Sequence, residues 1–254
     1  MKYALINGII LVGTKDMEPI KDKIILINGK MIEDITDLNY STDGYKVIDL
    51  NGKYIMPGLI NMHVHLPASG KVKKKASDPV KLVKLITANS LTRRIGIEIC
   101  KKAALEELYS GVTTIRCVGG VSDFDSIIRD NINRGKWSGP RIFCSDMALS
   151  VEGGHMAHSL AYALKDKNDA VNKVDLINRK NVDLIKLMIT GGVLDAKKEG
   201  EPGEVKMSAE LVKTSCERAH ELGLKVAAHV ESYEGVKLAL ENGVDSIEHG
   251  ACID

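Results

Sequence analysis

The chain has 254 residues, enough for one large barrel or two modest domains with a sizeable core. Its 35 basic residues are balanced by 34 acidic ones, and a net charge of +1 argues against nucleic acid as a partner. The lysine-rich run at 71–75 is interpreted as a solvated loop.

The chain contains no apolar stretch long enough to span a bilayer, and its N-terminus makes a poor signal peptide. Its five cysteines are scattered, form no CxxC pair and have mostly apolar neighbours, which is typical of small core residues in a reducing compartment. We therefore expect a cytoplasmic protein without a membrane partner.

Residues 1–56 contain short apolar runs at 3–6, 23–27 and 47–50. Each run is followed by an Asn-Gly pair, which is a strong hairpin signal between β-branched segments. The pattern predicts a small all-β unit.

After Pro57-Gly58 the pattern changes to apolar strands that alternate with amphipathic helices. Strands are predicted at 59–65, 112–118, 141–147, 182–189, 225–230 and 246–249. Helices are predicted between them, for example at 94–109, 170–178, 209–222 and 233–242. This alternation predicts an α/β fold with a parallel sheet over 57–254. Six strands are two short of a closed (β/α)₈ barrel, so we expect a TIM-type barrel that is incomplete at its C-terminus.

Four of the seven histidines lie at the ends of predicted strands, where a barrel carries its functional side chains. His63 and His65 are two apart on one strand and therefore face the same way. His229 and His249 end two later strands. A strand histidine is often an ordinary core residue, but four of them converging on one barrel mouth favour a metal site.

Lys186 lies inside the apolar run of the fourth predicted barrel strand. A buried ammonium is costly unless it is paired, so one interpretation is an ion pair with a carboxylate inside the barrel. The other is that burial lowers the pKa of Lys186, and that the neutral amine reacts with carbon dioxide to give an N6-carboxylysine able to bridge two metals.

The motifs at these positions resemble those of the amidohydrolase superfamily, in particular its imidazolonepropionase-like and Xaa-Pro dipeptidase-like members. The segment 54–65 is similar to the entry from sandwich to barrel, 182–192 to the carbamate-lysine strand, and 226–229 and 246–250 to the histidine motifs of strands five and six. The resemblance implies an N-terminal β-sandwich part at 1–56 and barrel strands one to six at 57–254.

The resemblance also implies the roles of these residues. His63 and His65 would bind the more buried of two divalent metals, His229 and His249 the more exposed one, and carboxylated Lys186 would bridge them. A hydroxide held between the metals would be the nucleophile. Zinc is the expected metal, although imidazole and carboxylate ligands also suit manganese and iron.

Two positions resemble substrate-binding residues of the family. His155 follows Gly153-Gly154 in a segment similar to a substrate-contacting loop, and a surface histidine is the alternative. Arg116 resembles an arginine that ends strand two, but Cys117 stands where relatives commonly have aspartate.

The implied activity is hydrolysis of an amide-type C–N bond in a small substrate, either a dipeptide such as Xaa-Pro or a cyclic amide. In the family the catalytic aspartate follows strand eight. Because only strands one to six are predicted here, no catalytic residue is assigned. The alternative is a chain that binds metal without turnover. A mononuclear deaminase of the same superfamily fits Lys186 poorly. Exposed strand edges would favour association into a homo-oligomer.

Overall fold

A computed structural model describes residues 1–68, 78–193, 196 and 198–252, so the lysine-rich run at 71–75 lies outside the described residues. The chain divides into two compact units, Met1–Gly58 and Leu59–Asp254. No helix in the described ranges combines the length and apolar character that crossing a membrane requires.

The N-terminal unit contains two small sheets. The larger has the order β4-β3-β1-β5, and the smaller pairs β2 with β6. Their bounds are β1 Lys2–Ile6, β2 Ile9–Ile10, β3 Lys23–Asn28, β4 Met31–Asp37, β5 Lys46–Asp49 and β6 Tyr54–Ile55. Ala4, Ile24 and Leu26 form a buried cluster in the larger sheet. The predicted all-β character is therefore correct, whereas the sandwich arrangement stays a prediction.

Only one of the three Asn-Gly pairs closes a hairpin. β3 and β4 pair antiparallel across it, with Asn28 opposite Met31. At Asn7 and Asn51 the backbone adopts positive φ, +55° and +49°, but the next strand joins the other sheet. The hairpin prediction is wrong there because Asn-Gly chemistry permits a turn without fixing which strands pair.

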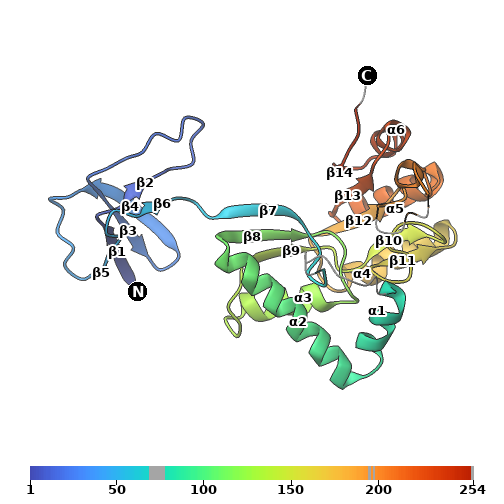
Figure 1. The fold of residues 1–254 in the computed structure, drawn as a ribbon, viewed down its shortest axis with the longest axis horizontal. Helices are drawn as coiled ribbons and strands as arrows, with labels where there is room; N and C mark the ends of the chain where they lie inside the picture. Colours follow the sequence, from blue (N-terminus) through green and yellow to red (C-terminus); the bar gives the residue numbers. More distant parts are fainter. Residues whose placement is uncertain (69–77, 194–195, 197, 253–254) are drawn as a thin grey trace. The chain divides into compact units, whose positions relative to one another are not determined.

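The second unit contains the six predicted strands, all parallel to their neighbours. Together with two further strands, β10 (Ala148–Val151) and β11 (Ala161–Leu164), they form two sheets, β7-β8-β9 and β11-β10-β12-β13-β14 (Figure 1). The predicted strands appear as β7 Leu59–Val64, β8 Val112–Cys117, β9 Arg141–Cys144, β12 Leu184–Met188, β13 Lys225–Val230 and β14 Ser246–His249. Within the described ranges β7 and β14 do not pair with each other, so the sheets do not close into a barrel.

The third predicted strand ends earlier than expected. It stops at Cys144, Asp146 adopts a left-handed φ of +51°, and the chain continues as β10 (Ala148–Val151). β10 pairs with β12 and with β11 (Ala161–Leu164), whereas β9 pairs with β8. Neither β10 nor β11 was predicted, because four-residue strands carry little periodicity.

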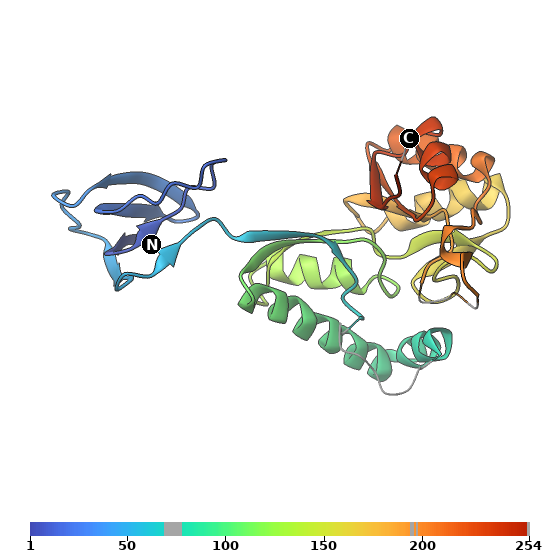
Figure 2. The ribbon, with the colours of Figure 1, turned by 45° about the horizontal axis from the view of Figure 1, so that its top comes forward.

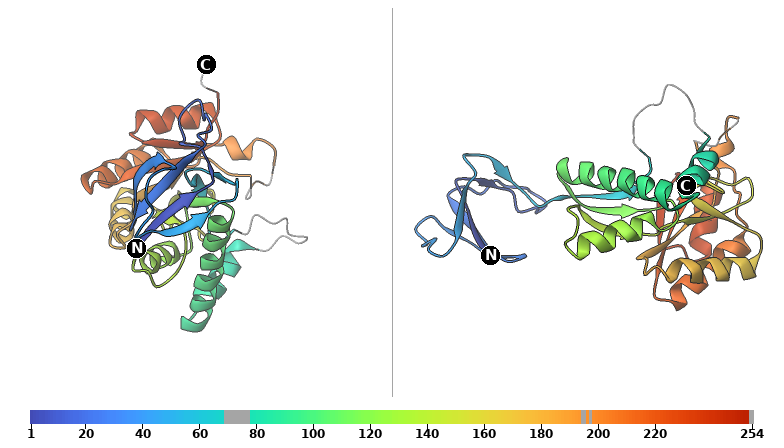
Figure 3. Two further views of the ribbon diagram at one scale, coloured as in Figure 1. Left: turned by 90° about the vertical axis from the view of Figure 1, so that its left-hand side faces the viewer. Right: turned by 90° about the horizontal axis from the view of Figure 1, so that it is seen from below.

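Helices cover the outer face of these sheets. Their bounds are α1 Pro79–Thr87, α2 Ser90–Tyr109, α3 Phe124–Asn133, α4 Lys167–Asn178, α5 Ala209–Glu221 and α6 Tyr233–Glu241. α2 and α3 lie along β7–β9, and α4 to α6 lie along the other sheet (Figures 2 and 3). Outward-facing strand residues pack against them, with Ile115 and Cys117 in one cluster and Ile185 and Val226 in another.

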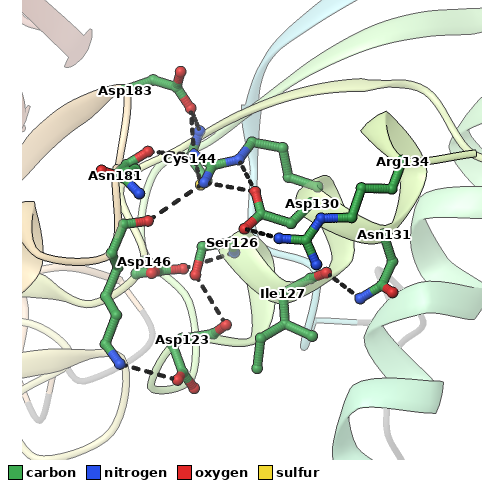
Figure 4. A network of polar contacts seen from close by, with 12 residues as sticks. Asp123, Ser126, Ile127, Asp130, Asn131, Arg134, Cys144, Asp146, Asn181 and Asp183 are labelled. Atoms are coloured by element: carbon green, nitrogen blue, oxygen red, sulfur yellow. Dashed lines mark hydrogen bonds and ion pairs between the residues drawn. The ribbon is translucent and has the colours of Figure 1, made fainter.

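The junction between the two sheets depends on Asp183. The Asp183 backbone N–H donates to the Cys144 carbonyl at 2.8 Å, and the Asp183 carboxylate accepts from the Cys144 N–H at 2.9 Å. The buried Arg129 of α3 donates to the same carboxylate at 3.2 Å and to the Asn181 carbonyl at 2.6 Å. Figure 4 shows this network, which also includes Asp130. Arg129 therefore joins α3 to the segment that leads into β12.

Replacing Arg129 by methionine should lower the free energy of unfolding by about 2 kcal/mol, because Asp183 and two carbonyls lose a charged donor. Arg134→Met is the matched control. Arg134 contacts Asp130 at 4.0 Å, but its side chain is 65% exposed, and exposed ion pairs contribute little. Chemical denaturation of both variants tests the difference, and equal losses would contradict the assigned role of Arg129.

Candidate metal centre

A β-bulge in β7 sets the direction of the first two histidines. Asn61 pairs with Ile115 and Val64 with Cys117, so β7 has one residue more than β8 between these pairs. Met62 lines the inner cavity beside Arg116, and after the bulge Val64 packs outward while His63 contacts inner-face groups. Bulges commonly re-aim side chains beside functional sites in this way.

A left-handed residue sets the direction of His249. Ser246 and Glu248 both contact Arg116 on the inner face, and Ile247 packs outward against the core. Simple alternation would turn His249 outward with Ile247. Instead, its φ is +71°, and its ring lies 4.8 Å from that of His63. Such a conformation costs about 1 kcal/mol or more for a non-glycine residue, and strain of this kind concentrates at functional sites.

His63 and His65 direct two ring nitrogens at each other. The Nδ1 of His63 lies 2.8 Å from a Glu248 oxygen, and the Nδ1 of His65 lies 2.8 Å from the Gly119 carbonyl. Because both partners are acceptors, both Nδ1 atoms carry hydrogen. The two Nε2 atoms, 3.3 Å apart, then face each other with lone pairs unless a proton or a metal cation lies between them.

The Nε2–Nε2 separation fits a shared metal. Two nitrogens each bound to zinc at about 2.05 Å in tetrahedral geometry lie about 3.3 Å apart. Burial lowers the pKa of His65 to about 4, and the nearby His63 and Lys186 act in the same direction. At neutral pH the His65 ring is therefore uncharged, which is the form that binds metal.

A second group of ligands lies at the ends of β13 and β14. His229, Glu231 and His249 each offer a ligand atom, and these atoms all lie within 4.8 Å of one another. His229 is buried, and its ring centroid is 4.6 Å from that of His249. Burial and the neighbouring His155 lower the pKa of His229 to about 3, so its ring is also neutral near pH 7. Glu231 was not predicted as a ligand, although it follows His229 by two residues and residues at this spacing face the same way in a strand.

Lys186 lies near both groups of histidines, because its charge lowers the pKa values of His65 and of His229. Its side chain is 1% exposed, and no acceptor in the described part of the chain hydrogen-bonds to its Nζ. Burial lowers the pKa of Lys186 to about 7, with Glu248 opposing this shift and Arg116 adding to it. A large fraction of the amine is therefore neutral and nucleophilic at physiological pH.

The two predicted substrate-binding residues occupy different places. His155 is buried, and its ring stacks on that of His229 with centroids 4.3 Å apart, so it is not a surface histidine. A Cβ at Gly192 would lie 2.1 Å from the His155 ring, so only glycine permits this approach. His155 lines a cavity of about 520 Å³ together with Lys206.

Arg116 lines a different inner cavity, of about 330 Å³, and donates to Glu248 at 2.5 Å and to the Met62 carbonyl at 2.7 Å. Glu248 was not predicted as a site residue. In the structure its side chain is buried, with 5% exposed, and contacts His63. This placement favours a role for Arg116 in holding Glu248, and substrate contact by Arg116 stays a prediction.

The second unit is an α/β fold with parallel sheets. Imidazoles and a buried lysine gather at the inner face of these sheets and form a candidate two-metal centre. Residues 54–254 match the model of the Amidohydrolase family, and the chain belongs to that family.

Individual relatives are consistent with this assignment. A dihydroorotase of Bacillus pumilus is 39% identical over 75 residues, which are 30% of this chain and 17% of that protein. A 5'-deoxyadenosine deaminase of Methanobrevibacter smithii is 31% identical over 171 residues, which are 65% of this chain and 34% of that protein.

Two solved structures are similar over the whole chain. A Xaa-Pro dipeptidase with bound methionine in the active site has a TM-score of 0.81 and 28% identity, and the match covers 100% of this chain and 63% of that one. A putative prolidase from Bifidobacterium longum has a TM-score of 0.79 and 32% identity, with 100% and 55% covered. This chain thus spans less than two thirds of the length of each of these relatives.

The low pKa of His65 predicts the pH dependence of stability for the metal-free protein. Its pKa falls from 6.5 to about 4 on folding, so between these pH values the unfolded state binds more protons than the folded state. Above about pH 6.5, His65 is neutral in both states and does not alter the pH dependence of stability. As the pH falls from 6.5 toward 4, His65 is protonated in the unfolded state first, so the free energy of unfolding falls by about 3 kcal/mol.

Denaturation in the presence of a chelator measures this loss. His65→Gln should be less sensitive to pH over the same window than the parent protein, whereas His158→Gln, in an exposed loop position, should follow the parent. The same pH dependence in His65→Gln and the parent would contradict the assignment.

Proposed function

We propose that this chain carries the metal-binding part of a hydrolase that cleaves an amide-type C–N bond in a small substrate. An Xaa-Pro dipeptide is the first candidate substrate, and a cyclic amide is the second. The observation that carries the proposal is the pair of facing His63 and His65 nitrogens, with the unpartnered Lys186 amine buried nearby.

The resemblance to a Xaa-Pro dipeptidase and to a putative prolidase supports the dipeptide substrate. Two curated relatives of this chain are a dihydroorotase and a deaminase, so family membership alone does not choose the reaction. Lys186 favours a two-metal hydrolase over a mononuclear deaminase, because one metal held by histidines leaves a buried amine without a partner.

The donor set fits two divalent cations, with zinc as the proposed metal. His63 and His65 would hold one ion, and His229 and His249 the other, with Glu231 as an additional candidate ligand. When bound, such ions supply Lewis acidity and a nucleophilic hydroxide at neutral pH.

Lys186 would contribute the bridging anion. Its neutral Nζ attacks carbon dioxide, a C–N bond forms, and one proton is released to solvent, which leaves an anionic carbamate. With cations bound, the carbamate would supply an anionic ligand, and its negative charge would offset part of their charge inside the sheet. His155 would lie beside the second site, where its ring could orient a substrate oxygen in the adjoining cavity.

Lys186→Met tests the bridging lysine, because methionine keeps similar volume and removes the amine. Protein isolated with zinc and carbonate should bind about two ions per chain in the parent and about one or fewer in the variant. Incubation with ¹³C-bicarbonate should give a carbamate signal by NMR in the parent only. The melting temperature of the metal-free variant should not fall, because an unpaired buried amine is removed.

Lys225→Met is the matched control, since Lys225 begins the neighbouring strand β13 with a side chain that is 78% exposed. It should keep both the metal content and the carbamate signal. A parent protein with less than about one ion per chain would refute the metal site. Full metal content without turnover of a dipeptide panel would support the alternative of metal binding without catalysis.

A further inference from the structure

We propose that Glu248 is a positioning residue that fixes the tautomer of His63, and that Arg116 holds Glu248 in place for this task. The proposal rests on the metal site of the proposed function, and assigns roles to two residues that do not themselves bind metal. The carboxylate would decide which His63 nitrogen is available to a cation.

Glu248 has both oxygens engaged by different donors. One oxygen lies 2.8 Å from Nδ1 of His63, and the other accepts from Nη2 of Arg116 at 2.5 Å. The carboxylate is 5% exposed, so water does not replace either partner at low cost. The hydrogen bond to Nδ1 leaves Nε2 of His63 as the lone-pair atom that faces His65. Such carboxylate–histidine contacts commonly orient metal-binding imidazoles.

Arg116 is itself held in place by two further hydrogen bonds on the inner face. Its Nε donates to the Met62 carbonyl on β7 at 2.7 Å, and its Nη1 donates to Ser246 Oγ on β14 at 3.2 Å. Because a guanidinium can only donate, the Glu248 oxygen that faces Arg116 must be an acceptor. The other oxygen must accept as well if His63 is to keep its hydrogen on Nδ1.

Glu248→Gln can accept a hydrogen bond from Arg116 or from Nδ1 of His63, but not from both. A glutamine amide has nearly the shape of the carboxylate but offers one acceptor and one donor group. Arg116 takes the amide oxygen, so the amide NH₂ faces Nδ1 of His63 and moves the ring hydrogen to Nε2. The variant should therefore fold normally but lose the lone pair that faces His65. We expect the affinity for zinc alone, measured against a competing chelator, to fall about 10–100-fold.

Nitrogen-15 NMR of the metal-free protein reads the tautomer directly. The parent should show hydrogen on Nδ1 of His63, and Glu248→Gln should show it on Nε2. Adding Arg116→Met to Glu248→Gln frees the amide oxygen to turn toward His63, and should restore both the Nδ1–H tautomer and part of the zinc affinity. A role in stability alone predicts no such rescue, because the double variant removes one more buried contact.

Ser246→Ala is the matched control, because it removes a 3.2 Å contact to Arg116 and a long 3.4 Å contact to Glu248 but keeps the hydrogen bonds that Glu248 makes with His63 and with Arg116. Its zinc affinity should stay within about threefold of the parent. Unchanged zinc affinity and an unchanged His63 tautomer in Glu248→Gln would overturn this inference while leaving the metal site intact. A parent protein that binds no zinc would instead overturn the proposed function.

Discussion

The contacts between inner-face residues of the second unit depend on one group, the buried Glu248 carboxylate. It accepts from His63 of β7 and from Arg116 of β8, and it extends from β14 at the far edge of the sheets. Burial opposes the ionisation of Glu248, but the His63 hydrogen bond and the charges of Lys186 and Arg116 outweigh it and lower its pKa to about 2. One buried anion on β14 thus binds donors from β7 and from β8 and links three strands of the second unit.

Two local departures from regular strand geometry bring the histidines to this interior. The bulge in β7 shifts His63 and His65 to the inner face, and the positive φ of His249 turns its ring toward them. Regular alternation would turn the rings of His63, His65 and His249 outward, away from this interior. The site is therefore built from backbone irregularities as much as from the choice of side chain.

The sequence predicted the strands whose residues are buried on both faces, because their continuous apolar runs are unambiguous. The segment at 182–189 is the clearest, and Lys186 was noticeable because it interrupts such a run. The sequence did not predict the break at Asp146, because a left-handed φ has no reliable signal in a single aspartate.

For the site, spacing was enough to pair His63 with His65, but the direction of His249 depends on a backbone angle. Glu248 and Glu231 were missed because a carboxylate beside a histidine is usually solvated, and only the fold shows that Glu248 is buried. Reading the sequence for polar residues that alternation would turn inward would have identified Glu248, since Ser246 and Glu248 share a face.

The third predicted strand changes partner where β9 ends and β10 begins. β9 bonds to β8 and β10 bonds to β12, and two hydrogen bonds between Cys144 and Asp183 join β9 to the residue that precedes β12. A continuous ladder transmits gradual twist from strand to strand, whereas a junction with few hydrogen bonds permits a sharper bend. Asp183 supplies both an N–H donor and a carboxylate acceptor to Cys144, so loss of its carboxylate would leave one backbone hydrogen bond between these two residues at the junction of the sheets.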